Sequence, residues 1–200
     1  MSVAAILLAA GAGSRFGSPK QLAELDGETL VRRAARAALD SRCTSVVVVV
    51  GAHRSAVEAA LSGLDVQIVF HAAWEDGMAS SIRVGLDAVA AELPRADGAL
   101  LLLADQVAVT PALLDALIER FETGDADLVA CAYADTQGPP ALFARRFFAE
   151  LEELRGDRGA RNVLSAHAAE VTLVDFPGGA NDVDTPADLR RNPTNRGTSG

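Results

Sequence analysis

The sequence has few cysteines and few basic residues. Among its 200 residues are only two cysteines, Cys43 and Cys131, and 18 Lys and Arg stand against 27 Asp and Glu, which gives a formal net charge of −9. Two distant cysteines lack the spacing of a zinc site, so we expect two reduced thiols. A chain this acidic has no clustered Lys and Arg for a nucleic-acid or anionic-membrane surface, so neither partner is expected.

Long apolar runs are also missing. The run Val3–Ala10 is shorter than the roughly 20 residues of a membrane-spanning helix, and no basic segment precedes it as in a signal peptide. We therefore expect a cytoplasmic protein. Half of the residues are apolar, which is enough for one sizeable core at this length. With no linker or repeat visible, we expect one domain over residues 1–191 and a disordered polar tail over 192–200.

What the sequence does have is a regular alternation of short aliphatic runs and amphipathic segments. This alternation is typical of a mostly parallel sheet covered by helices on both faces, so we expect an α/β, Rossmann-like, three-layer sandwich. The runs expected as strands are Val3–Leu8, Val46–Val50, Val66–Phe70, Ala99–Leu103, Leu128–Ala132 and Val171–Val174. The segments expected as helices are Thr29–Leu39, Ala56–Leu61, Ser80–Ala91, Pro111–Phe121, Ala144–Leu154 and Arg158–Ala166.

A glycine-rich loop, LAAGAGSRFGSPKQL over residues 8–22, follows the first expected strand. Ligands of open parallel sheets bind beyond the carboxyl ends of the strands, and glycines let backbone N–H groups approach phosphate oxygens. Arg15 and Lys20 supply positive charge. The loop therefore predicts a triphosphate site. A flexible turn with solvated Arg and Lys is the alternative, because a glycine-rich loop alone is a weak signal.

Two common phosphate-binding motifs do not fit this loop. The dinucleotide fingerprint places its third glycine three residues after the second, whereas Gly17 lies four after Gly13, and Pro19 interrupts the helix that should begin there. The Walker loop needs adjacent Gly and Lys followed by Ser or Thr, whereas Lys20 lies between Pro19 and Gln21. The loop is therefore neither of these motifs.

Aspartates at two points of the chain are candidates for holding a metal ion. Asp105 ends an apolar strand and so faces the same crevice as the glycine loop. Asp182 and Asp184 are spaced by one residue, which puts both on one side of an extended segment. Mg²⁺ takes one or two protein carboxylates together with substrate phosphates, so we expect Mg²⁺ on Asp105 with Asp182 or Asp184. A turn or cap role is the alternative, and it explains Asp184 more easily than Asp182.

Polar residues also mark two later segments. Gly77 and the serines Ser80 and Ser81 begin an expected helix, where N–H groups and hydroxyls favour an anionic ligand; an N-cap role explains the serines equally well. The later arginines that can meet an acceptor phosphate are Arg145, Arg158 and Arg161, although a solvated helix face is the commoner fate of surface arginine.

Together these segments resemble the molybdenum cofactor cytidylyltransferase-like nucleotidyltransferases of the MobA/MocA type. The resemblance rests on the loop at 8–22, GMASS at 77–81, Asp105 and DVDTPAD at 182–188, and it covers Val3 to Leu189. It implies the nucleotide-diphospho-sugar transferase-like fold. It also implies transfer of a nucleoside monophosphate from an NTP, with CTP favoured, to a phosphorylated acceptor such as molybdopterin, with release of pyrophosphate.

The resemblance also implies roles for single residues. Arg15, Lys20 and Asp105 are the expected catalytic residues, and the metal falls to Asp105, Asp182 and Asp184. The residues expected at the nucleotide are Ala9, Ala10, Gly11, Ala12, Gly13, Ser14, Lys20, Ser80, Ser81 and Asp105. The sequence departs from the family pattern at Val107 and Pro139, where many relatives have Pro and His. The second departure bears on acceptor recognition.

Other functions can use the same glycine loop and the same metal-binding aspartates. They are a GTP-dependent guanylyltransferase, a sugar-phosphate nucleotidyltransferase, and a non-catalytic nucleotide-binding accessory protein for molybdoenzyme maturation. A molybdoenzyme or its chaperone is an implied partner. Intact Arg15, Lys20, Asp105 and Asp182 argue against a site without catalytic function.

Overall fold

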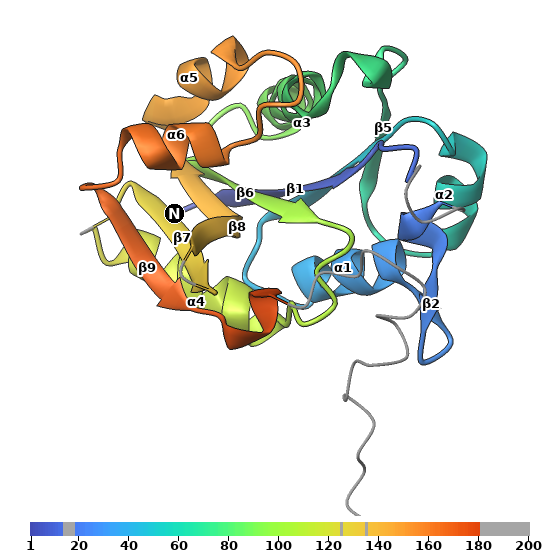
Figure 1. The fold of residues 1–200 in the computed structure, drawn as a ribbon, viewed down its shortest axis with the longest axis horizontal. Coiled ribbons are helices and arrows are strands. Elements are labelled where there is room, and N and C mark those ends of the chain that lie inside the picture. Colours follow the sequence, from blue (N-terminus) through green and yellow to red (C-terminus); the bar gives the residue numbers. More distant parts are fainter. Residues whose placement is uncertain (14–18, 125, 135, 181–200) are drawn as a thin grey trace, which may run out of the picture.

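The computed structural model describes residues 1–13, 19–124, 126–134 and 136–180. Its centre is a seven-stranded sheet in the order β5-β4-β1-β6-β8-β7-β9, and β2 and β3 form a separate two-stranded ribbon (Figure 1). The strands are β1 (Val3–Ala9), β2 (Glu24–Leu25), β3 (Glu28–Thr29), β4 (Ser45–Val50), β5 (Gln67–Phe70), β6 (Gly98–Leu103), β7 (Leu128–Tyr133), β8 (Thr136–Ala144) and β9 (Val171–Asp175).

Helices cover both faces of the sheet. Figure 1 shows α3, α5 and α6 on one face and α1 and α4 on the other, and contacts between these helices and the strands agree with this arrangement. The α-helices are α1 (Leu30–Leu39), α2 (Arg54–Ala60), α3 (Met78–Glu92), α4 (Pro111–Glu122), α5 (Phe148–Glu153) and α6 (Arg161–Ala166). Short 3₁₀ helices are η1 (Lys20–Leu22), η2 (Trp74–Asp76), η3 (Arg145–Phe147) and η4 (Pro177–Ala180). The three-layer α/β fold is confirmed.

The central strand β1 explains why the first apolar run does not alternate with polar residues. It pairs in parallel with β4 on one side and β6 on the other, and the residues from Ala4 to Leu7 have no exposed surface. A strand covered on both faces is apolar throughout. Because β1, β4, β5 and β6 all run in parallel, their carboxyl ends share one edge, and the loops that follow them meet there.

Strand β8 corrects the expected count of six strands. It lies antiparallel between β6 and β7, and it occupies a segment with Gly138-Pro139-Pro140 where no strand was expected. Proline cannot donate to a strand ladder. The register with β7 shifts between Ala130 and Cys131, which leaves both prolines outside the pairing. The irregularity therefore lets a strand with two prolines sit inside the sheet.

Two further expectations concern the chain termini and the membrane. Of the helices in the described ranges, none combines the length and apolarity of a bilayer crossing. The polar tail expected at 192–200 lies outside the described residues, as do Ser14, Arg15, Asp182 and Asp184.

The helix expected to begin at Ala144 is corrected, because Ala144 ends β8 and α5 begins only at Phe148.

Candidate functional site

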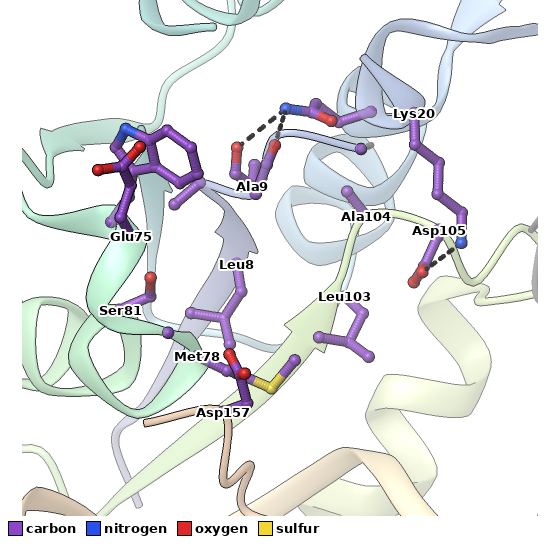
Figure 2. A pocket seen from close by; sticks show the side chains of 16 residues that line it. Leu8, Ala9, Lys20, Glu75, Met78, Ser81, Leu103, Ala104, Asp105 and Asp157 are labelled. Atoms are coloured by element: carbon purple, nitrogen blue, oxygen red, sulfur yellow. Dashed lines mark hydrogen bonds and ion pairs between the residues drawn. The ribbon is translucent and has the colours of Figure 1, made fainter. Parts of the chain in front are cut away.

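A cavity of about 400 Å³ lies beyond the carboxyl ends of β1 and β6. This volume is within the range of small-molecule sites. Leu8 and Leu103, at the ends of the two strands, line it together with Gly11 and Gly13 of the glycine loop. In Figure 2, Lys20 and Asp105 lie on one side of the cavity, and Glu75, Ser81 and Asp157 lie on the other. The structure thus brings together the loop, the strand end and the start of α3, as the sequence predicts.

The described part of the glycine loop is fixed by hydrogen bonds that its backbone carbonyl groups accept. The buried side chain of Gln21 donates from Nε2 to the carbonyl oxygens of Ala9, at 3.4 Å, and Gly11, at 2.9 Å. The backbone N–H of Ala52 donates to the carbonyl of Ala10 at 3.0 Å. These bonds hold the loop in place from behind. Gln21 is a positioning residue that the sequence analysis missed, although it is part of the quoted PKQL run.

Lys20 and Asp105 form an ion pair at the edge of the cavity. Lys20 Nζ lies 2.8 Å from Asp105 Oδ2, and both side chains are mostly buried. The second oxygen, Asp105 Oδ1, is buried and has no hydrogen-bond partner within the described ranges. A buried carboxylate oxygen without a partner is costly and uncommon. It is a natural ligand position for a divalent cation, which prefers carboxylate oxygens.

Asp105 is the described member of the expected metal set. Within residues 1–13, 19–124, 126–134 and 136–180, no group of three or more His, Cys, Asp or Glu side chains gathers into a metal site. Asp182 and Asp184 fall outside these ranges, so their expected role stays a prediction. The same holds for Arg15 and Ser14 on the phosphate side.

The two serines at the start of α3 face different surroundings. Ser81 lines the cavity together with Trp74 and Glu75 from η2. Ser80 does not line the cavity, and its hydroxyl lies 2.7 Å from His71 Nε2 and 2.6 Å from the carbonyl oxygen of Gly77. Burial lowers the pKa of His71 below its usual value, so its imidazole is neutral at neutral pH. Ser81, and not Ser80, is therefore placed to meet a ligand directly.

A second cavity, of about 700 Å³, adjoins the first. Met78, Leu103 and Asp157 line both cavities. The second cavity adds three arginines, Arg155, Arg158 and Arg161, which supply positive charge to a site in an acidic protein.

Arg161 and Arg145 differ in their relation to this cavity. Arg161 donates from Nη2 to the hydroxyl of Tyr133 at 2.8 Å, which holds it beside the cavity. Arg145 donates to the carbonyl of Ala96, at the start of β6 and so at the opposite edge of the sheet. The expectation that Arg145 meets the acceptor is therefore corrected. Antiparallel β8 carries the chain from the site edge at Gly138 to the opposite edge at Ala144.

One family model and two curated proteins match most of this chain. The model of the MobA-like NTP transferase domain matches residues 5–171. Nicotine blue oxidoreductase of Paenarthrobacter nicotinovorans is 33% identical over 202 positions, covering 94% of this chain and 95% of that protein. Purine catabolism protein PucB of Bacillus subtilis (strain 168) is 29% identical, covering 90% and 91%.

A solved structure agrees in fold. Rv0371c from Mycobacterium tuberculosis H37Rv is 34% identical, covers 96% of both chains and superposes with a TM-score of 0.83. Its complex with manganese matches with a TM-score of 0.78 at 31% identity, covering 96% of this chain and 97% of that one. The family model spans most of the chain and includes the glycine loop, the start of α3 and Asp105. This chain is therefore a member of the MobA-like NTP transferase family.

Proposed function

We propose that the protein transfers a nucleoside monophosphate from CTP to a phosphorylated acceptor of the molybdopterin type and releases pyrophosphate. The observation that carries the proposal is the arrangement around Asp105. This carboxylate lies in the turn after β6, lines the same cavity as the glycine loop, pairs with Lys20 through one oxygen and buries the other without a described partner. Such a group would hold a divalent cation, which would supply positive charge beside the phosphates of an NTP.

A divalent cation at this point neutralises phosphate charge when it is bound. We propose Mg²⁺, held by Asp105 together with Asp182 or Asp184. The manganese complex of Rv0371c supports a divalent cation in a related protein. The unpartnered Asp105 Oδ1 supports the same assignment in this chain.

The chain's own residues would position the substrates and offset charge. Phosphoryl-type transfer needs these two contributions more than covalent chemistry from the protein. Backbone N–H groups of the glycine loop, with Lys20 and Arg15, would hold the triphosphate and stabilise the departing pyrophosphate. An acceptor phosphate oxygen attacks the α-phosphorus as the bond to the pyrophosphate oxygen breaks. No covalent enzyme intermediate is required.

The second cavity is the proposed seat of the acceptor. It adjoins the first cavity, and Met78, Leu103 and Asp157 line both, so ligands in the two cavities would lie next to each other. Arg158 is exposed at this cavity and forms no ion pair within the described residues, and Arg161 lies beside Tyr133. Guanidinium groups recognise phosphate through charge-assisted hydrogen bonds.

Binding and turnover separate this proposal from its alternatives. Thermal unfolding is measured with Mg²⁺ and each of the four NTPs, because a ligand that binds the native state raises the midpoint of unfolding. Pyrophosphate release is then measured with molybdopterin as acceptor. We expect the largest shift and the fastest release with CTP. A preference for GTP would indicate the guanylyltransferase alternative, and nucleotide binding without pyrophosphate release would indicate an accessory protein or a redox role like the one in the name of the Paenarthrobacter relative.

The substitution Asp105→Asn tests the central residue. It removes the charge and keeps the size of the side chain, so we expect pyrophosphate release to fall by roughly a hundredfold or more. Asp87→Asn is the matched control, because Asp87 is exposed on α3 and does not line the cavity. An Asp105→Asn protein as active as the control would contradict the assignment.

A further inference from the structure

The turn that begins α3 forms a wall between the two cavities. Gly77 and Ser81 line the first cavity, Met78 lines both, and Asp157 from the facing loop also lines both. Figure 2 shows Met78 and Asp157 next to each other at this boundary. A ligand in one cavity is therefore separated from a ligand in the other by these few residues.

The turn at the start of α3 packs closely against the facing loop. Gly77 has φ +94°, and a Cβ built on it would lie 2.5 Å from the carbonyl carbon and oxygen of Gly156. The N–H of Ala79 donates to that same carbonyl oxygen at 3.0 Å. A Cβ at Gly159 would lie 2.9 Å from Met78 Sδ. Closely packed groups transmit displacement, so a shift of the turn shifts the loop that carries Arg158 and leads to Arg161 at the start of α6.

Hydrogen bonds of Ser80 and His71 stabilise this turn on the side away from the cavities. The Ser80 hydroxyl has one proton and lies 2.6 Å from the carbonyl oxygen of Gly77, to which it donates. It must then accept from His71 Nε2, which lies 2.7 Å away. The backbone N–H of His71 donates to the carbonyl of Val50 at 2.8 Å. A chain of hydrogen bonds thus joins the carboxyl end of β4 to the turn.

We propose that Ser80 and His71 are positioning residues that set the alignment between the NTP and the acceptor. Neither side chain lines either cavity, so neither acts by touching a substrate. Both are buried, at 3% and 7% exposure, which makes their mutual hydrogen bond costly to lose. This inference rests on the proposed function, because it assigns the second cavity to the acceptor.

The kinetics of Ser80→Ala test the proposal. Removing the hydroxyl frees the turn while leaving the glycine loop, Lys20 and Asp105 untouched. We expect kcat with CTP and molybdopterin to fall about tenfold or more, because small misplacements of reacting groups are expensive. The Kd for Mg²⁺–CTP, measured by titration calorimetry, should change less than twofold. Ser80→Thr keeps the hydroxyl and should restore most of the lost kcat.

Further variants keep the test decisive. Ser45→Ala removes a buried hydroxyl that has no described partner and lies away from both cavities, so it should leave kcat unchanged. If Ser80→Ala does not fold, His71→Leu takes its place in the test. The double variant should have a kcat no lower than that of the slower single variant, because both substitutions break the same chain of hydrogen bonds.

The outcomes distinguish this inference from the function on which it rests. Equal losses of CTP affinity and kcat, or no rescue by Ser80→Thr, would overturn the positioning role alone. Absence of transfer by the unsubstituted protein with every NTP would overturn the proposed function and this inference together.

Discussion

Ser80 and Ser81 are sequence neighbours with different surroundings. Successive residues of an α-helix point about 100° apart, so one hydroxyl can face a ligand while the next faces the core. Here Ser81 lines the cavity and Ser80 bonds to His71 and Gly77. The run GMASS identifies the segment that borders the site, but the rotation of the helix around its axis depends on its tertiary packing against β1, β4 and α5. Sequence reasoning could not supply that rotation.

A glycine substitution tests the interlocked turn at the residue scale. Gly77→Ala adds a Cβ to a residue at φ +94° and places it against the backbone of Gly156. A side chain in this backbone region (φ +94°, ψ −179°), which is essentially restricted to glycine, costs about 1–3 kcal/mol, and overpacking a filled site adds about 1–3 kcal/mol. We expect the free energy of unfolding, measured in urea, to fall by the sum of these costs.

Gly124→Ala is the matched control for this substitution. Gly124 also has positive φ, at +83°, but a Cβ there meets nothing within 4 Å. It should therefore lose only the conformational cost of about 1–2 kcal/mol. Equal losses for the two variants would show that the contact between Gly77 and Gly156 is not tight.

At the scale of elements, local signals predict some features well and others poorly. The sequence predicts α4 because Thr110 and Pro111 are suited to a helix start, and the structure confirms that Thr110 Oγ1 accepts from the N–H of Leu113 at 3.2 Å. The strands β1, β4 and β6 follow from aliphatic runs that are buried on both faces, and β5 follows from a shorter run at the edge of the sheet. Their shared carboxyl edge locates the site before any coordinates are known.

Strand β8 shows where such reasoning stops. Its prolines are unfavourable in a strand ladder, and only the tertiary pairing with β6 and β7 makes the segment a strand. Gln106 helps, because its Nε2 donates to the carbonyl of Pro139 at 2.8 Å. That contact joins the residue after Asp105 to β8 across 33 positions, a distance that no local pattern predicts. The hairpin of β2 and β3 was missed for a simpler reason, since strands of two residues carry no periodicity.

The start of α4 supplies a prediction at this scale. Thr110→Ala removes the acceptor for the N–H of Leu113, so the free energy of unfolding should fall by about 1 kcal/mol. Thr110→Ser keeps the acceptor and should lose much less. Thr123→Ala, at the exposed other end of the same helix, should be nearly neutral. Circular dichroism in a urea series measures all three, and a loss at Thr123 equal to that at Thr110 would contradict the cap.

At the scale of the whole molecule, two histidines make stability depend on pH in opposite senses. Hydrogen bonds to Glu170 and Glu150 raise the pKa of His167 above its ordinary value of 6.5. Burial lowers the pKa of His71 below the same value. The folded state therefore binds a proton more tightly than the unfolded state at His167 and less tightly at His71.

These shifts predict a sign for each variant. The stabilisation from His167 is fully present below pH 6.5 and is lost as pH rises through its folded pKa, so His167→Gln should be most harmful near pH 6 and less harmful near pH 8. His71 is the opposite case, because wild-type stability falls as pH drops below 6.5 and His71→Leu lacks that loss. Urea unfolding at pH 5.5, 6.5 and 8 measures both. A pH-independent effect of His167→Gln would refute the pairing with Glu150 and Glu170.

The order of strands has a consequence for how the protein is made. The strand that carries the glycine loop takes its two neighbours from residues 45–50 and 98–103, and Lys20 meets Asp105 across 85 positions. While residue 105 of the nascent chain is still inside the ribosome, the glycine loop lacks the strand end and the carboxylate that face it in the folded protein. The candidate site therefore forms only after β6 and Asp105 have emerged, well after the glycine loop has been synthesised.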